Sequence, residues 1–162
     1  MQRRGRVSGA PPAVILGVSC DFHDAAAALV IDGTLVAAAE EERFSRIKHD
    51  AELPVGAIAS ILAVAGLDAA DIEAVAFYER PMAVLQRYLA SRQRSGPRGL
   101  SSFSRDAPRL IGRNLLVSYR LDRALRDLGA TASPRFFHTD HHQSHAAAAF
   151  YPSPFERAAV VT

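Results

Sequence analysis

The stretch AVILGVSCDFHDAAAALVIDGTLVAAAE, residues 13–40, decides the fold. Its apolar runs over 14–19 and 25–31 are short and rich in branched residues, which favours buried strands. Asp32-Gly33 is a strong hairpin signal, so residues 34–39 are expected to return as a third strand. Because a two-residue link cannot make a crossover, the second and third strands must be antiparallel.

Beyond residue 40, expected helices alternate with expected strands. Pro54 suits the first turn of a helix that runs to about Ala65 and stops at Gly66. The apolar face of this helix would consist of Ile58, Ile61, Leu62 and Ala65. The elements expected after it are a strand at 74–78, a helix at 82–91, a polar loop at 92–105, a helix in one or two pieces at 110–128, a strand at 135–138, a helix at 141–150 and a strand beginning at 158–162.

The element order β-β-β-α-β-α-β-α-β predicts an α/β fold with a mixed sheet and flanking helices. This order resembles the half-domain of the sugar-kinase and actin-like ATPase superfamily, a ribonuclease H-like unit. A likeness at the level of fold does not assign a function. Residues 1–12 are basic and contain Gly and Pro, so we expect a disordered leader before a single unit over 13–162.

Composition excludes several classes of protein. The 162 residues carry a net charge of only +2, and the densest group of arginines shares its stretch with Gly, Ser and Pro, which is typical of a solvated loop and not of a nucleic-acid-binding face. Cys20 is the single cysteine and cannot form an internal disulfide, so a cytoplasmic location is expected. No apolar stretch is long enough to span a membrane.

Residues 138–150, HTDHHQSHAAAAF, hold four of the six histidines. On a helix with Asp140 as its N-cap, His141 and His145 lie at i and i+4 on one face, where two imidazoles can grip one ion. His142 and His145 are three apart and could also pair, though less directly. The cluster predicts a metal site with His141 and His145 as ligands for zinc or ferrous iron, completed by ligands from elsewhere.

This cluster has two other interpretations. A lone HxxxH match is weak, and a histidine-rich helix start can lack any chemical role. A zinc protease needs Glu directly after the first histidine as its base, and this chain has His142 there, which argues against that class.

Two further groups are candidates for the site. His23-Asp24 falls between the first two expected strands, where His23 could act as a general base with Asp24 orienting it; the alternative is a polar turn. In EEERFSRIKHD, residues 40–50, the cations Arg43, Arg46 and Lys48 could hold phosphate or an acidic substrate, although most charge runs are solvated surface.

Together these segments resemble one family. GVSCDFHDAAAALVIDGTLVAAAEEERFSRIKHD, residues 17–50, resembles the opening of the O-carbamoyltransferases that decorate antibiotics and nodulation factors. DHHQSHAAAAFYPSPF, residues 140–155, resembles their metal-binding helix. The usual HDS(A) appears here as His23-Asp24-Ala25. The resemblance extends over residues 14–162.

The resemblance implies a two-domain enzyme. A carboxy-terminal domain would make carbamoyl adenylate from carbamoyl phosphate and ATP. An amino-terminal domain, similar to the tRNA threonylcarbamoylation enzyme, would transfer the carbamoyl group to a hydroxyl of a small-molecule acceptor. His141 and His145 would bind the metal, and His23 would be the base near the acceptor hydroxyl.

The resemblance also implies that parts of the enzyme are missing. The family's next metal ligand, an aspartate in a DGxGE-like stretch, and the adenylate-forming domain would follow Thr162. We therefore expect a fragment that is inactive without its carboxy-terminal half. The alternatives are a threonylcarbamoyl-transferring tRNA enzyme, whose usual Glu-Gly before the second histidine is Gln143-Ser144 here, a sugar-kinase-like ATPase, and a non-enzymatic or regulatory fragment.

Overall fold

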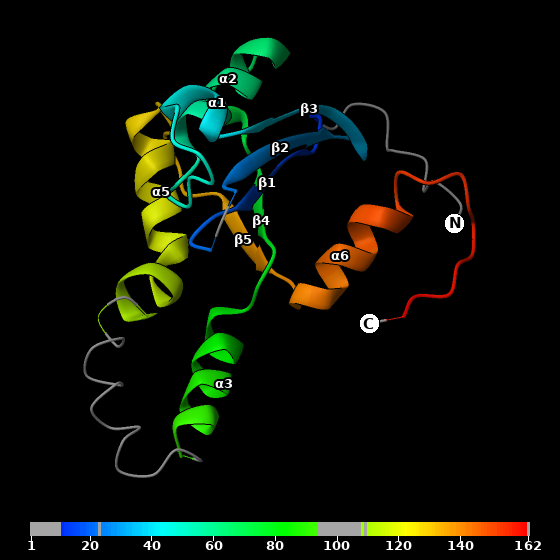
Figure 1. Cartoon of the computed structure of the whole chain (residues 1–162). Helices are drawn as coiled ribbons and strands as arrows, with labels where there is room; N and C mark the ends of the chain where they lie inside the picture. The colour runs from blue at the N-terminus through cyan, green and yellow to red at the C-terminus, as the bar shows by residue number, and fades with distance from the viewer. Residues whose placement is uncertain (1–10, 23, 94–107, 109, 162) are drawn as a thin grey trace.

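The computed structural model describes residues 11–22, 24–93, 108 and 110–161. Its centre is a five-stranded mixed sheet in the order β3-β2-β1-β4-β5 (Figure 1). Neighbours β1, β2 and β3 pair antiparallel, whereas β4 pairs parallel with β1, and β5 pairs parallel with β4. The strands are β1 (Val14–Ser19), β2 (Ala26–Ile31), β3 (Thr34–Glu40), β4 (Ala74–Phe77) and β5 (Arg135–His138).

The predicted hairpin between β2 and β3 is confirmed. Asp32 and Gly33 have φ values of 51° and 80°, the pair of left-handed residues that a tight type I′ turn requires. The Asp32 carboxylate also accepts a hydrogen bond from the backbone N–H of Ala13 at 3.1 Å. This bond ties the turn to the entry of β1.

The helices largely follow the prediction. The predicted helix at 110–128 is in two pieces, a π-helical stretch at Leu110–Leu115 and then α5. Gly66 ends α2 with a φ of 66°, as expected of a C-terminal glycine. The bounds are α1 (Glu42–Ser45), α2 (Val55–Ala65), a 3-10 turn (Ala69–Asp71), α3 (Pro81–Gln93), α5 (Val117–Asp127) and α6 (His141–Phe150).

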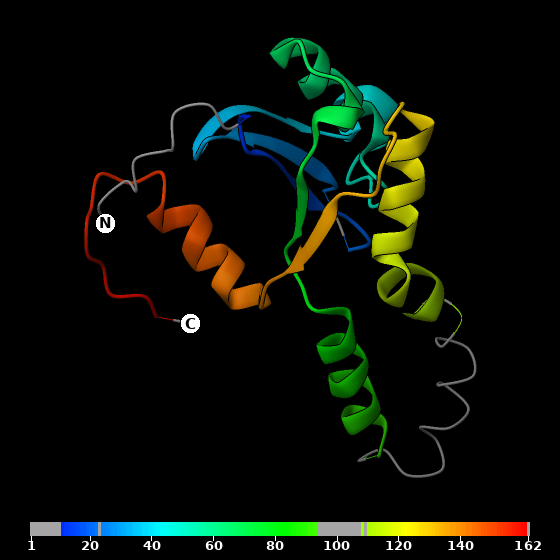
Figure 2. The ribbon, with the colours of Figure 1, turned by 180° about the vertical axis from the view of Figure 1, so that it is seen from behind.

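The hydrophobic core lies between one face of the sheet and helices α2 and α5. Leu16 and Leu29 from the sheet, Ile58 from α2, and Leu121 and Leu125 from α5 are completely buried there. Figures 1 and 2 show α6 on the other side of the sheet. No residue of α6 is buried, so that face of the sheet is only loosely covered.

The prediction of a strand that begins within 158–162 is wrong for residues 158–161, the part of that range that the structure describes. Residues 158–161 have no regular structure, and the side chain of Val161 is 98% exposed. Apolar β-branched residues favour a strand, but a strand forms only where a neighbour accepts its hydrogen bonds. Ala158 and Val160 instead line a cavity of about 570 Å³ beside α6 and β4.

Two other expectations concern residues that the structure does not fully describe. The basic leader at 1–12 falls outside the described residues except at Pro11 and Pro12, and the loop at 92–105 falls outside them except at its first two residues. Within the described parts of the chain, none of the helices combines the length and the apolar character needed to cross a bilayer.

Candidate functional site

The sheet topology brings the predicted site segments to one edge. Because β4 runs parallel to both β1 and β5, the carboxyl ends of these three strands lie at the same edge of the sheet. Antiparallel β2 begins at that edge and β3 ends there. The segments that lie at this edge are 20–22, 24–25, 40–51, 78–81 and 139–145.

The two predicted metal ligands lie side by side on the first turns of α6. The Nε2 atoms of His141 and His145 are 3.2 Å apart, and their ring centroids are 4.6 Å apart. Two imidazole nitrogens that bind one zinc ion at about 2.0–2.1 Å are about 2.8–3.4 Å apart when the angle at the metal is near 90–110°. The spacing of the pair therefore fits two ligands of one ion.

The described residues around this pair offer no further metal ligand. Nδ1 of His141 is buried and has no hydrogen-bond partner within the described part of the chain. Among the described residues, no third histidine, cysteine or carboxylate joins the pair within ligand distance. A metal site on these two histidines would therefore need further ligands, and it stays a prediction.

Asp140 occupies the N-cap position of α6, but its side chain does not cap the helix. The carboxylate instead lies 3.3 Å from the Nε atom of Arg80, in the loop after β4. His138, the neighbouring histidine, is also engaged, because its ring bonds to the Ser118 hydroxyl at 3.0 Å and to the Glu79 carbonyl at 3.2 Å. His138 thus has a structural role.

Tyr78 connects the pair His141 and His145 to the loop after β1. Its ring lies edge-on to that of His141, with centroids 5.5 Å apart, and its hydroxyl donates to the carbonyl oxygen of Cys20 at 3.1 Å. Burial raises the pKa of Tyr78 to about 12, so this hydroxyl stays protonated at neutral pH. Burial also raises the pKa of the Cys20 thiol well above its ordinary value, which leaves it a poor nucleophile.

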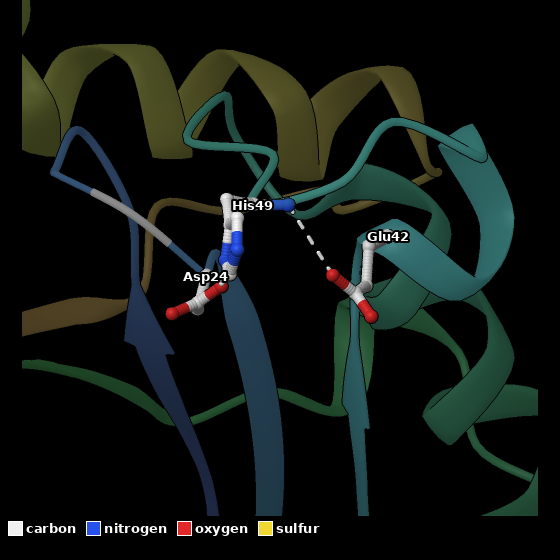
Figure 3. Close-up of side chains that lie close together, drawn as sticks. All are labelled: Asp24, Glu42 and His49. Atoms are coloured by element: carbon white, nitrogen blue, oxygen red, sulfur yellow. Dashed lines mark hydrogen bonds and ion pairs between the residues drawn. The ribbon is translucent and has the colours of Figure 1, made fainter.

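The predicted base His23 lies outside the described residues, whereas its neighbour Asp24 is described. The Asp24 carboxylate contacts a different histidine, and Figure 3 shows the two side chains together with Glu42. Its Oδ1 atom lies 2.8 Å from Nδ1 of His49. Sequence reasoning had not assigned His49 to the site, because residues 25 positions apart give no local signal.

The three predicted cations lie within α1 or just after it. Arg43 lies 3.7 Å from Glu40, and Lys48 lies 3.2 Å from Glu42. Hydrogen bonds from the His49 backbone N–H and the Lys48 ammonium lower the pKa of Glu42. Arg46 ends α1 in a left-handed conformation with its side chain exposed. Arg43, Arg46 and Lys48 therefore present positive charge at the surface, partly offset by Glu40 and Glu42.

A buried ion pair also holds the loop after β1 and was missed from the sequence. Nη1 of Arg120 in α5 lies 2.7 and 2.9 Å from the two carboxylate oxygens of Asp21, whose side chain is 3% exposed. Glu52 joins this group through Arg113 and Arg120. The pair anchors the loop that carries Asp24 to the helical layer.

Comparison with known proteins finds one matching family model and several related sequences. A family model described as the carbamoyltransferase N-terminus matches residues 14–162. An uncharacterised protein of Synechocystis sp. is 43% identical over 150 residues, 91% of this chain and 24% of the relative. The nodulation protein NolNO of Sinorhizobium fredii is 38% identical over 145 residues, 87% of this chain and 19% of the relative. The chain thus spans a quarter or less of the length of these two relatives.

Proposed function

The chain belongs to the carbamoyltransferase family, whose amino-terminal region it matches, and from this we propose that it carries the acceptor-side site of an O-carbamoyl transfer. The reaction would move a carbamoyl group from carbamoyl adenylate to a hydroxyl of a sugar or natural-product acceptor. The observation that carries the proposal is the pair His141 and His145, with Nε2 atoms 3.2 Å apart at the sheet edge where the loops meet.

His141 and His145 would hold a divalent ion, zinc or ferrous iron, with further ligands from outside the described residues. Such an ion, when bound, supplies Lewis-acid stabilisation of negative charge on an oxygen of the reacting group. Tyr78 supports the orientation of His141, because its ring packs against the imidazole while its hydroxyl is fixed on Cys20. The Asp140 carboxylate, next to His141 in the sequence, pairs with Arg80.

The other predicted site residues could bind a negatively charged carbamoyl donor. Arg43, Arg46 and Lys48 are exposed cations on the segment that follows β3 at the same edge. They would attract the phosphate of carbamoyl adenylate, since a guanidinium or ammonium forms charge-assisted hydrogen bonds with phosphate oxygens. His23 stays our proposed base beside Asp24.

The whole reaction would need more than this chain. We infer that a carboxy-terminal half, present in longer relatives, makes carbamoyl adenylate from carbamoyl phosphate and ATP and acts as partner. The order β3-β2-β1-β4-β5 supports assignment to the actin-like, ribonuclease H-like half-domain class. The unpaired, buried Cys20 supports a reducing cytoplasm.

A transfer assay tests the proposal. The zinc- or iron-loaded chain, complemented with the carboxy-terminal part of a longer relative, is mixed with carbamoyl adenylate and hydroxyl acceptors of three classes, an aminoglycoside, a macrolactam and a lipo-oligosaccharide, and carbamoylated product is detected by mass spectrometry. Product should form with at least one acceptor and fall at least about 100-fold in the double variant His141→Ala, His145→Ala. Product that forms equally well in the double variant would refute the proposed role of the pair.

A further inference from the structure

The face of the sheet that carries α6 is apolar and incompletely covered. Side chains alternate between the two faces of a strand, so the register partners Ile15, Val30 and Leu35 lie on the face opposite to the core. Ile15 is 36% exposed and Leu35 is 61% exposed. Phe137 of β5, on the same face, is 52% exposed. Apolar side chains that gather on one exposed face mark an interaction surface.

The middle of this face is hollow. One row of register partners crosses all five strands and consists of Ala38, Ala28, Gly17, Ala76 and Phe137. The first four of these line two cavities of about 570 Å³ each, one formed by β1, β2 and β3 and the other between β4 and α6. Side chains this small leave room for another layer of protein to approach the backbone of the sheet closely.

The strand directions also call for a second layer. β4 pairs parallel with both β1 and β5, and parallel strands occur where protein covers both faces of the sheet. Helices α2 and α5 cover the core face. On the other face, α6 has no buried residue and gives little cover (Figures 1 and 2). A complete sheet of this kind therefore needs further protein over β1, β2 and β4.

The relatives and the course of the chain indicate what this protein layer is. More than three quarters of each of the Synechocystis and Sinorhizobium relatives lies outside the part that matches this chain. Residues 158–161 run along this side of the sheet, where Ala158 and Val160 line the cavity between β4 and α6. A chain that continues from them is delivered to the hollow face, which favours the following part of the relatives over a second copy of this chain.

We propose that this open face, formed by Ile15, Gly17, Ala28, Leu35 and Phe137, is the docking surface for the part of the longer relatives that follows the matched region. The inference rests on the proposed function, in which that part is the partner that supplies carbamoyl adenylate. It adds the surface through which the two associate, on the side of the sheet that carries α6 and its histidines.

Binding between two separate polypeptides tests the docking surface without any catalysis. The 162-residue chain is titrated, by biolayer interferometry, with the part of the Synechocystis protein that follows the matched region. The unaltered chain should bind, and Leu35→Lys should raise the Kd at least about tenfold, because docking buries the added charge without a partner. Absence of binding by the unaltered chain, or an equal Kd for the variant, would overturn the proposal.

Val64→Lys is the matched control. Val64 is 74% exposed on α2, which packs on the core face of the sheet, and a helix surface tolerates lysine well. The Kd of this variant should therefore equal that of the unaltered chain. Equal increases in Kd for Leu35→Lys and Val64→Lys would overturn the proposal, because a general effect of charge would then explain both.

Gly17→Val tests the close approach to the hollow middle of the face. A Cβ atom on Gly17 meets the carbonyl oxygen and the Cβ of Ala28 at 3.7 and 4.0 Å, which is ordinary contact, and valine is favoured in strands. The variant should keep the urea midpoint of the unaltered chain and raise the Kd at least about tenfold, because its side chain fills space that the docked layer occupies. A retained midpoint with an unchanged Kd would overturn the proposal; if the variant does not fold, Leu35→Lys decides alone.

Sedimentation of the chain by itself tests the competing occupant. The account predicts no dimer that depends on this face, and a dimer that Leu35→Lys dissociates would assign the face to a second copy and overturn the proposal. Since binding needs neither carbamoyl donor nor acceptor, a complex that forms but does not transfer counts against the proposed function alone. Binding that ignores the face variants counts against the docking surface alone.

Discussion

At the scale of single residues, a buried glutamate performs a role that the local sequence does not reveal. The Glu41 carboxylate accepts hydrogen bonds from the N–H groups of Gly56 and Ala57, at 3.0 and 2.7 Å. These are orphan donors in the first turn of α2, and Pro54 at the N-cap position offers no side-chain acceptor. Glu41 thus caps α2 from a distance and joins the segment of α1 to the core.

Replacement of Glu41 by alanine should destabilise the fold. The change leaves two partly or fully buried N–H groups without acceptors, and we expect a loss of about 1–3 kcal/mol in the free energy of unfolding. Urea unfolding followed by circular dichroism measures it. Glu40→Ala is the control, since the exposed Glu40 makes only a surface ion pair with Arg43, and it should change stability by about 0.5 kcal/mol or less. Equal effects of the two variants would contradict the capping role.

Tyr78 should make stability sensitive to alkaline pH. Its pKa is raised by burial to about 12 from an ordinary value near 10, so the folded state favours the neutral phenol. The stabilisation is fully present below pH 10 and is lost as the pH rises from about 10 to 12. Tyr78→Phe cannot ionise, so its stability should fall less steeply over this window, as urea midpoints at several pH values would show. Parallel curves for the two proteins would contradict a raised pKa of Tyr78.

At the scale of elements, local signals predicted most of the fold and long-range contacts had to come from the structure. The Asp-Gly turn, Pro54 and Gly66 act within a few residues, and each fixed an element boundary correctly. The pair Arg120 and Asp21 spans 99 positions and leaves no periodic trace in the sequence. Composition likewise favoured a strand after residue 157, but residues 158–161 have no regular structure.

In the candidate site, too, contacts within one element could be predicted and contacts between elements could not. Spacing at i and i+4 brought His141 and His145 together, because a helix imposes that proximity. The partner of Asp24 was not predictable, because His49 approaches through a left-handed loop on another segment. Sequence reasoning therefore found the residues within one helix and missed those that meet across loops.

Helix α6 should be less stable than α2 and α5 until a metal is bound. None of its residues is buried, whereas α2 and α5 each bury four. Its amide hydrogens should therefore exchange faster than those of α2 and α5, because local opening costs little where few apolar contacts are lost. Zinc should slow exchange in the first turns of α6 by holding His141 to His145. Hydrogen exchange with mass spectrometry, with and without zinc, measures both effects; α6 protection equal to that of α5 in the absence of metal would contradict this account.

At the scale of the whole molecule, one face of the sheet is packed and the other is only partly covered. The cavity of about 570 Å³ between α6 and β4 lies on the partly covered side, and it is lined mainly by small or apolar residues such as Ala76, Ala146 and Ala147. The proteins of Synechocystis sp. and Sinorhizobium fredii are each at least four times as long as the part that matches this chain. The candidate site thus consists of the histidines of α6 and the loops at the same edge of the sheet, with a cavity beside α6.

Calorimetric titration with zinc, and with ferrous iron under anaerobic conditions, tests the central claim most directly. The account predicts that the chain binds one ion and that the double variant His141→Ala, His145→Ala loses at least about tenfold in affinity. The control His142→Ala removes an exposed neighbour and should bind as the unaltered chain does. Absence of binding in the unaltered chain, or equal binding in the double variant, would contradict a metal site built on His141 and His145.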